Sequence, residues 1–107
     1  MNAATRLWRR LRERPASRED AAAEEYQRRL DYHITFGTEH GQRVFADLLR
    51  RAGLMQSSYT LGDTHETARR EGARRFGLEL VEIITSDPDA VARMLRSGQV
   101  EELFPHE

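Results

Sequence analysis

Two stretches of helix-spaced apolar residues, separated by a short polar connector, constrain most strongly what this chain of 107 residues can fold into. The first stretch has the i, i+1, i+4, i+5, i+8 spacing of one apolar helix face at Val44, Phe45, Leu48, Leu49 and Ala52. The connector, residues 55–62, is rich in serine, threonine and glycine. We therefore expect an antiparallel helical hairpin over residues 36–84.

The second stretch is expected to bury one stripe of helix-spaced residues, namely Ala68, Gly72, Phe76, Leu80 and Ile83 or Ile84. A glycine inside a helix costs about 0.5–1 kcal/mol relative to alanine. The two glycines of this helix, Gly72 and Gly77, therefore predict that another backbone approaches closely. Asp47 and Arg74 lie near the middle of the two helices, and we expect them to form an ion pair across the hairpin.

Capping residues mark the inner ends of both helices. Gly53 is predicted to supply the left-handed residue that ends the first helix, with Leu54 folding back on Leu49. Asp63 and Glu66 form a capping pair at the start of the second helix. These signals indicate that the connector is a true loop and not a continuation of either helix.

The N-terminal part of the chain is predicted to form two further helices. The first covers residues 3–14 and ends at Pro15, because the residue before a proline is disfavoured in the α region. Ser17 is the expected N-cap of the next helix, which runs to about Thr35. That helix has helical spacing at Ala22, Tyr26, Leu30 and His33 or Ile34.

At the C-terminal side, Asp87 and Pro88 are expected to begin a last short helix that ends at Gly98. The predicted fold is all-α: the antiparallel hairpin, one additional packed helix, and extended helical N- and C-terminal arms. The expected divisions are a basic amphipathic arm at 1–16, a helical domain at 17–86, and a short helix with a C-terminal tail at 87–107.

Charge is distributed unevenly along the chain. Residues 1–18 hold six arginines and one glutamate, whereas the other 89 residues carry 11 arginines and 17 acidic residues. The chain has no lysine, and a GC-rich genome would explain this use of arginine in its place. The planar guanidinium of arginine also suits phosphate and carboxylate groups. A basic arm therefore precedes an acidic body.

The two ends of the chain are predicted to be binding arms. The apolar stripe of the basic arm could enter a partner's groove or a membrane interface, through Leu7, Trp8 and Leu11. Its arginines could instead contact nucleic-acid phosphates, through Arg6, Arg9, Arg10 and Arg12. A third reading is an ordinary solvated helix whose Trp8 packs on the body. Leu103 and Phe104 are expected to dock the other arm.

Patterns that would indicate catalysis are missing from the sequence. Its four histidines are too far apart for a helical metal-binding pair, and there is no phosphate-binding loop or nucleophile elbow. A metal site from Glu39, His40 and His65 would require two helix N-termini to meet. We therefore expect no enzyme activity, no cofactor and no metal. Cysteine is absent, and the longest apolar run is far shorter than the roughly 20 residues of a membrane-spanning helix.

The central block also resembles a known family. The ordered residues are 36–49 (Phe-Gly-Thr-Glu-His-Gly-Gln-Arg-Val-Phe-Ala-Asp-Leu-Leu), Gly53, the pair at 57–58 (Ser-Ser), Thr67 and 70–78 (Arg-Glu-Gly-Ala-Arg-Arg-Phe-Gly-Leu). This order resembles small phage-encoded proteins of the Bordetella-podophage type, over residues 36–84. The connector departs from the family pattern at Leu54 and Met55, where valine or isoleucine followed by phenylalanine is expected.

The resemblance implies a non-enzymatic protein encoded among head, portal and ejection genes. The leading expectation is a multi-copy structural component of a tailed-phage particle, located in the virion and in the host cytoplasm during assembly. Its partners would be other virion proteins and copies of itself, at the portal, the connector or an internal ejection assembly. The alternative is a small DNA-associated regulatory or packaging-accessory protein that uses the arginine-rich arm. A membrane partner is not expected.

Overall fold

The computed structural model describes residues 2–12, 17–54 and 62–104, with the backbone alone for 8–12. Within these ranges the chain forms five α-helices and one short 3₁₀ helix, and no strand. Their bounds are α1 (Ala3–Arg12), α2 (Arg18–Phe36), α3 (Glu39–Arg51), α4 (Thr64–Ile84), α5 (Pro88–Ser97) and η1 (Val100–Leu103). The all-α prediction is confirmed.

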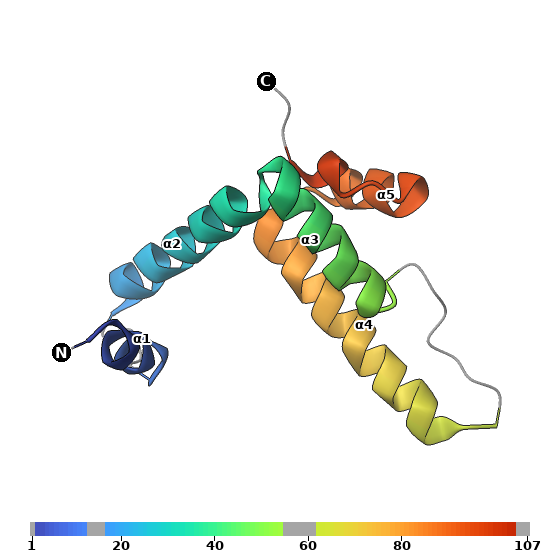
Figure 1. Cartoon of the computed structure of the whole chain (residues 1–107), viewed down its shortest axis with the longest axis horizontal. Helices are drawn as coiled ribbons and strands as arrows, with labels where there is room; N and C mark the ends of the chain where they lie inside the picture. Colours follow the sequence, from blue (N-terminus) through green and yellow to red (C-terminus); the bar gives the residue numbers. More distant parts are fainter. Residues whose placement is uncertain (1, 13–16, 55–61, 105–107) are drawn as a thin grey trace.

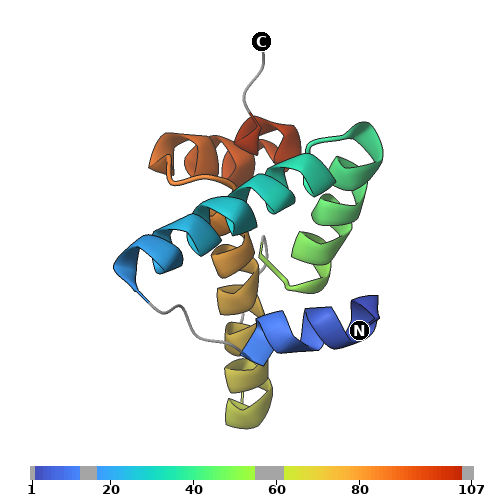
Figure 2. The same cartoon turned by 90° about the vertical axis from the view of Figure 1, so that its left-hand side faces the viewer.

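Helices α3 and α4 run in opposite directions, and the other elements are arranged around this pair (Figure 1). The C-terminal part of α2 contacts both helices, and α2 crosses near the end of α4 (Figure 2). The rest of α2 extends away from the pair, so that the two parts form an open angle in Figure 1. α5 and η1 pack against each other, and η1 also packs against α3.

The predicted capping residues adopt the expected geometry. Gly53 has a φ of 71°, and its N–H donates to the Arg50 carbonyl at 3.0 Å. The Leu54 N–H donates to the Leu49 carbonyl at 3.2 Å, which completes a Schellman motif. Asp63 accepts the Glu66 N–H at 2.8 Å, so the start of α4 is capped as predicted.

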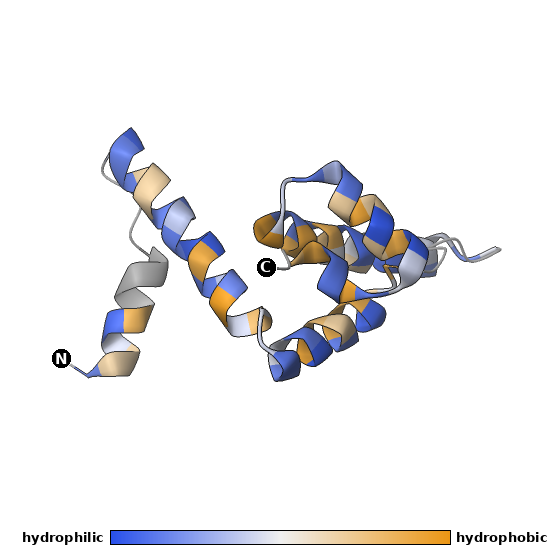
Figure 3. Ribbon diagram, turned by 90° about the horizontal axis from the view of Figure 1, so that it is seen from above, coloured by the Kyte–Doolittle hydropathy of each residue, from blue (hydrophilic) through white to orange (hydrophobic). Residues whose placement is uncertain are grey.

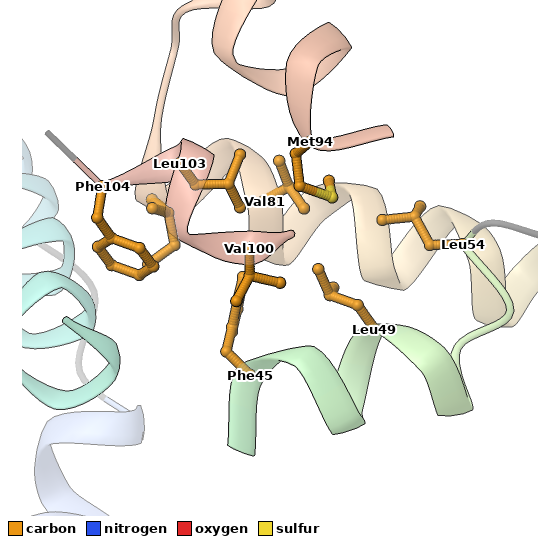
Figure 4. Packing of buried hydrophobic residues seen from close by; sticks show 9 residues of the cluster. Phe45, Leu49, Leu54, Val81, Met94, Val100, Leu103 and Phe104 are labelled. Carbon is orange, nitrogen blue, oxygen red and sulfur yellow. The ribbon is translucent and has the colours of Figure 1, made fainter. Parts of the chain in front are cut away.

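The hydrophobic core lies where α3, α4, α5 and η1 converge (Figure 4). Its buried members are Phe45, Leu49, Leu54, Val81, Ile84, Met94, Val100, Leu103 and Phe104. Phe45 is the centre of an aromatic group: its ring centroid lies 5.0 Å from that of Phe36 in α2 and 6.4 Å from that of Phe104. This group joins α2 and the C-terminal segment to the helix pair.

The prediction of an extended C-terminal docking arm is wrong for the described part of that segment. Leu103 and Phe104 are buried in the core, 3% and 7% exposed. Gly98, with a φ of 72°, ends α5 in the left-handed conformation. The chain then continues into η1, which packs on α3 and α5 and so brings Leu103 and Phe104 into the core.

The buried face of α4 agrees with the predicted stripe only at its C-terminal end, where Ile84 is buried and Leu80 packs against the core. Gly77, Val81 and Ile84 are buried, whereas Gly72 is exposed and Phe76 is 59% exposed. Neighbouring residues point about 100° apart around a helix, so a shift of one residue turns the buried face by that angle. The bulky Phe76 was expected in the core, but the neighbouring glycine occupies the contact with α3.

Candidate interaction surfaces

Glycine permits two close approaches that position the helices. A Cβ added at Gly77 would lie 3.0 Å from the Ala52 Cβ, which confirms the predicted close approach at this residue. At Gly72 no atom lies within 4 Å of an added Cβ, so the same prediction is wrong there. At Gly41 an added Cβ would lie 2.1 Å from the Thr35 carbonyl oxygen. The turn from α2 into α3 therefore requires glycine at position 41.

The predicted ion pair between Asp47 and Arg74 is wrong. The Asp47 carboxylate binds within its own helix instead, to Arg51 Nε at 2.8 Å and to Arg50. These two guanidiniums, Arg51 first, lower the pKa of Asp47 below its ordinary value, and Asp47 raises the pKa of Arg51. Arginines three and four residues later on α3 are closer to the carboxylate than a residue on another helix.

Glu66 has a similar position in the first turn of α4. Arg69 and Arg70 both donate to its carboxylate, Arg70 Nε at 2.9 Å. The hydrogen bonds from Arg69 and then Arg70 lower the pKa of Glu66 to about 2. Because Glu66 binds these arginines, its side chain does not return to the Asp63 N–H as a full capping box requires. The ionised carboxylate also lies at the positive end of the α4 dipole.

Arg29 joins α2 to the hairpin through a contact that no local sequence pattern indicates. Its Nη1 donates to the carbonyls of Glu82 and Ile83 at 3.0 and 3.4 Å, and its Nε donates to Glu25 at 3.0 Å. The last carbonyls of a helix have no partner inside the helix and carry partial negative charge. Arg29 therefore caps the C-terminal end of α4 from a residue more than 50 positions away.

The face of α2 that carries this contact agrees with the predicted apolar stripe only at His33, one of the two residues expected at its C-terminal end. Arg29, His33 and Phe36 lie toward the hairpin, where His33 contacts Phe104 at a ring-centroid distance of 5.8 Å. Tyr26 and Ile34 are 69% and 63% exposed. Figure 3 shows apolar positions along α2 where it extends away from the bundle.

Other large apolar side chains are exposed on the described surface. They are Leu7 on α1, Leu30 on α2, Val44 and Leu48 on α3, Phe76 on α4, and Leu95 on α5. Scattered apolar side chains are normal on a soluble protein, but contiguous groups mark binding surfaces. Groups of this kind on α2 and on the α3–α4 pair are the candidate interaction surfaces.

The basic arm is only partly described. Residues Ala3–Arg12 form α1, in which Arg6 and Leu7 are exposed. The side chains of Trp8, Arg9, Arg10, Leu11 and Arg12 lie outside the described residues. Arg6 and Leu7 are thus accessible as predicted, while binding by this arm stays a prediction.

Hollows on the described surface are possible sites for small ligands. The junction of α2, α4 and α5 has a hollow of about 470 Å³ lined by residues that include Arg29, Leu78, Thr85 and Val91. No group of three or more potential metal-binding side chains occurs among the described residues. His40 Nδ1 lies 2.7 Å from Arg43, which also binds Glu39. In the described part of the chain, no helix is long and apolar enough to cross a membrane.

In the part that the structure describes, this chain is a small all-helical protein. Its most distinctive surface features are exposed apolar faces. Its family is shown by a family model for Bbp19-like phage proteins, which matches residues 32–96. This match covers more than half of the chain, so the chain belongs to the Bbp19-like family of phage proteins. The resemblance found over residues 36–84 is thereby confirmed. No curated protein and no solved structure matches the chain.

Proposed function

We propose that this chain is a non-enzymatic structural component of a tailed-phage particle, present in several copies. Membership of a phage protein family restricts the setting to phage infection. The observation that carries the proposal within that setting is the exposed apolar surface of α2, a helix with no buried residue. A surface of this kind is typical of a subunit that is covered when it assembles.

The proposed location is the portal or connector, or an internal ejection assembly, with the host cytoplasm as the site before assembly. Its partners are then other virion proteins and copies of itself. Subunits of such assemblies do their work by binding, which needs interaction surfaces and no reactive cluster. A small helical hairpin with apolar faces suits this role.

The test is quantitative mass spectrometry of gradient-purified, nuclease-treated particles. We expect the chain in intact particles at a reproducible multiple of the portal subunit, and abundant host proteins provide the contamination control. Comparison of particles before and after DNA ejection separates a retained connector component from an ejected one. Absence of the chain from purified particles would contradict the proposal.

A second candidate function is a DNA-associated regulatory or packaging-accessory role. The supporting observation is that α1 is a formed helix in which Arg6 is exposed. Arg9, Arg10 and Arg12 belong to the same helix. If these four arginines contact phosphates, duplex affinity should fall steeply with salt, with a log–log slope of roughly −4. Changing all four to glutamine should remove that salt dependence. Duplex binding that does not change with salt or with the four substitutions would exclude this role.

A further inference from the structure

The exposed apolar residues of α2 form one continuous stripe, which we call the α2 stripe: Tyr26, Leu30 and Ile34. They are spaced i, i+4, i+8 and therefore lie on one side of the helix. Most of the stability of a helix in a protein comes from packing of an apolar face. α2 is 19 residues long and buries no residue completely in the single chain. Its stripe therefore lacks a cover.

A second apolar group lies on the hairpin and begins on α3. Ala46 and Arg50 line a groove against α5 and η1. Val44 and Leu48 are each two residues from these positions, which is about 200° around the helix. Val44 and Leu48 therefore lie on the opposite side of α3, away from α5, and both are exposed.

Phe76 extends this group onto α4. Leu78 lines the hollow formed with α5, and Phe76, two residues earlier, lies on the opposite side of α4. Since α5 and η1 cover one side of the hairpin, Phe76 shares the uncovered side with Val44 and Leu48. We call these three residues the α3–α4 patch. The close approach of Gly77 to Ala52 brings the two helices together beside it.

The helices that carry the two surfaces differ in net charge. α2 carries five acidic residues and three arginines, whereas α3 carries three arginines and two acidic residues, and residues 64–76 of α4 carry four arginines and two acidic residues. Beside the α3–α4 patch, Arg51 lies three residues after Leu48 and Arg69 lies seven residues before Phe76. These arginines bind Asp47 and Glu66, yet their side chains are 76% and 71% exposed.

We propose that the occupant of the α3–α4 patch is the α2 stripe of a second copy of this chain, docked reciprocally. Apolar residues would cover one another, and the acidic α2 would meet the more basic α3 and first half of α4, which favours this pairing over contact between two α2 stripes. A reciprocal contact is self-complementary and closes as a two-fold dimer. This inference rests on the proposed multi-copy role and names the surfaces that would join the copies.

The chain has no cysteine, so single cysteines report the contact directly. The full-length variants Ile34→Cys and Phe76→Cys, one of them tagged, are mixed and oxidised mildly. We expect a mixed disulfide-linked dimer to form faster than a linked dimer of either variant alone. Leu95→Cys, an exposed apolar position on α5 outside both surfaces, is the control for random collision. A mixed dimer no faster than this control would overturn the proposal.

Disruption of either surface provides the second measurement. In light scattering over a concentration series, Phe76→Glu and Ile34→Glu should each raise the dimer dissociation constant about tenfold or more, with helicity retained. Leu95→Glu should leave it unchanged. A wild-type chain that stays monomeric throughout would overturn the proposal. Absence of the chain from phage particles would not affect these assays, so the virion role and the dimer contact can fail separately.

Discussion

The Cβ that an alanine would place at Gly77 lies 3.0 Å from the Cβ of Ala52, so α4 passes the end of α3 at a distance suited to glycine. This contact determines which face of α4 is buried. A larger residue at position 77 would push the two helices apart, whereas the exposed Phe76 beside it has no such constraint.

We predict that Gly77→Val lowers the free energy of unfolding by about 1–3 kcal/mol, because its methyl groups would overlap α3. Urea denaturation followed by circular dichroism measures this change. The matched control is Gly72→Ala on the same helix, where the added Cβ meets no atom. That change should raise the free energy of unfolding by about 0.5–1 kcal/mol through helix propensity. Equal effects at the two sites would refute the close contact.

Leu103→Ala should lower the free energy of unfolding by about 2–5 kcal/mol, since it leaves a cavity in the core. The partly exposed Leu95 provides the comparison, and Leu95→Ala should cost much less. Chemical denaturation of the two variants under the same conditions checks the prediction. A Leu103→Ala variant as stable as wild type would contradict the burial of Leu103 and favour an exposed docking side chain.

Arg29→Ala should lower the free energy of unfolding by about 1–2 kcal/mol, because the carbonyls of Glu82 and Ile83 lose a charged donor. Arg28→Ala is the control: Arg28 also binds Glu25, but its partner is on its own helix. That exposed pair should contribute less than about 1 kcal/mol. Hydrogen exchange in α2 should increase in the Arg29 variant alone, and indistinguishable variants would contradict the capping contact.

The lowered pKa of Glu66 predicts a specific pH dependence. The folded value of about 2 lies below the ordinary value of 4.5, so ionised Glu66 stabilises the fold above pH 4.5. This contribution is lost as the pH falls from 4.5 towards 2. Glu66→Gln should therefore have a lower Tm than wild type at pH 7, and the difference should vanish near pH 2. High salt should reduce the difference at pH 7, and a difference that is constant with pH would contradict the assignment.

Interactions between residues close in the sequence could be predicted from the sequence. The cap at Asp63 and the helix end at Gly53 each involve residues no more than five positions apart. Their geometry depends on backbone sterics and short-range hydrogen bonds, which the local residues specify. The all-α class followed from the same kind of local pattern, whereas the family followed from the resemblance of residues 36–84.

The family match included Gly41, for which the sequence offered no physical reason. The structure supplies one, because the chain folds back at the turn into α3 and leaves no room for a Cβ beside the Thr35 carbonyl. Position 41 comes six residues after Thr35, so this is a contact made by the turn and not by helix periodicity.

Local sequence patterns are therefore sufficient to place the helix boundaries of this protein, because those boundaries depend on neighbouring residues. The choice of buried faces, in contrast, depends on tertiary packing. Periodicity selects an apolar side of α4 only to within one residue, and the approach of α3 selected Gly77 over Phe76. The burial of Phe104 and the contact of Arg29 with Glu82 depend on segments far apart in the sequence. Burial depends on tertiary contacts of this kind, and a local sequence pattern does not specify them.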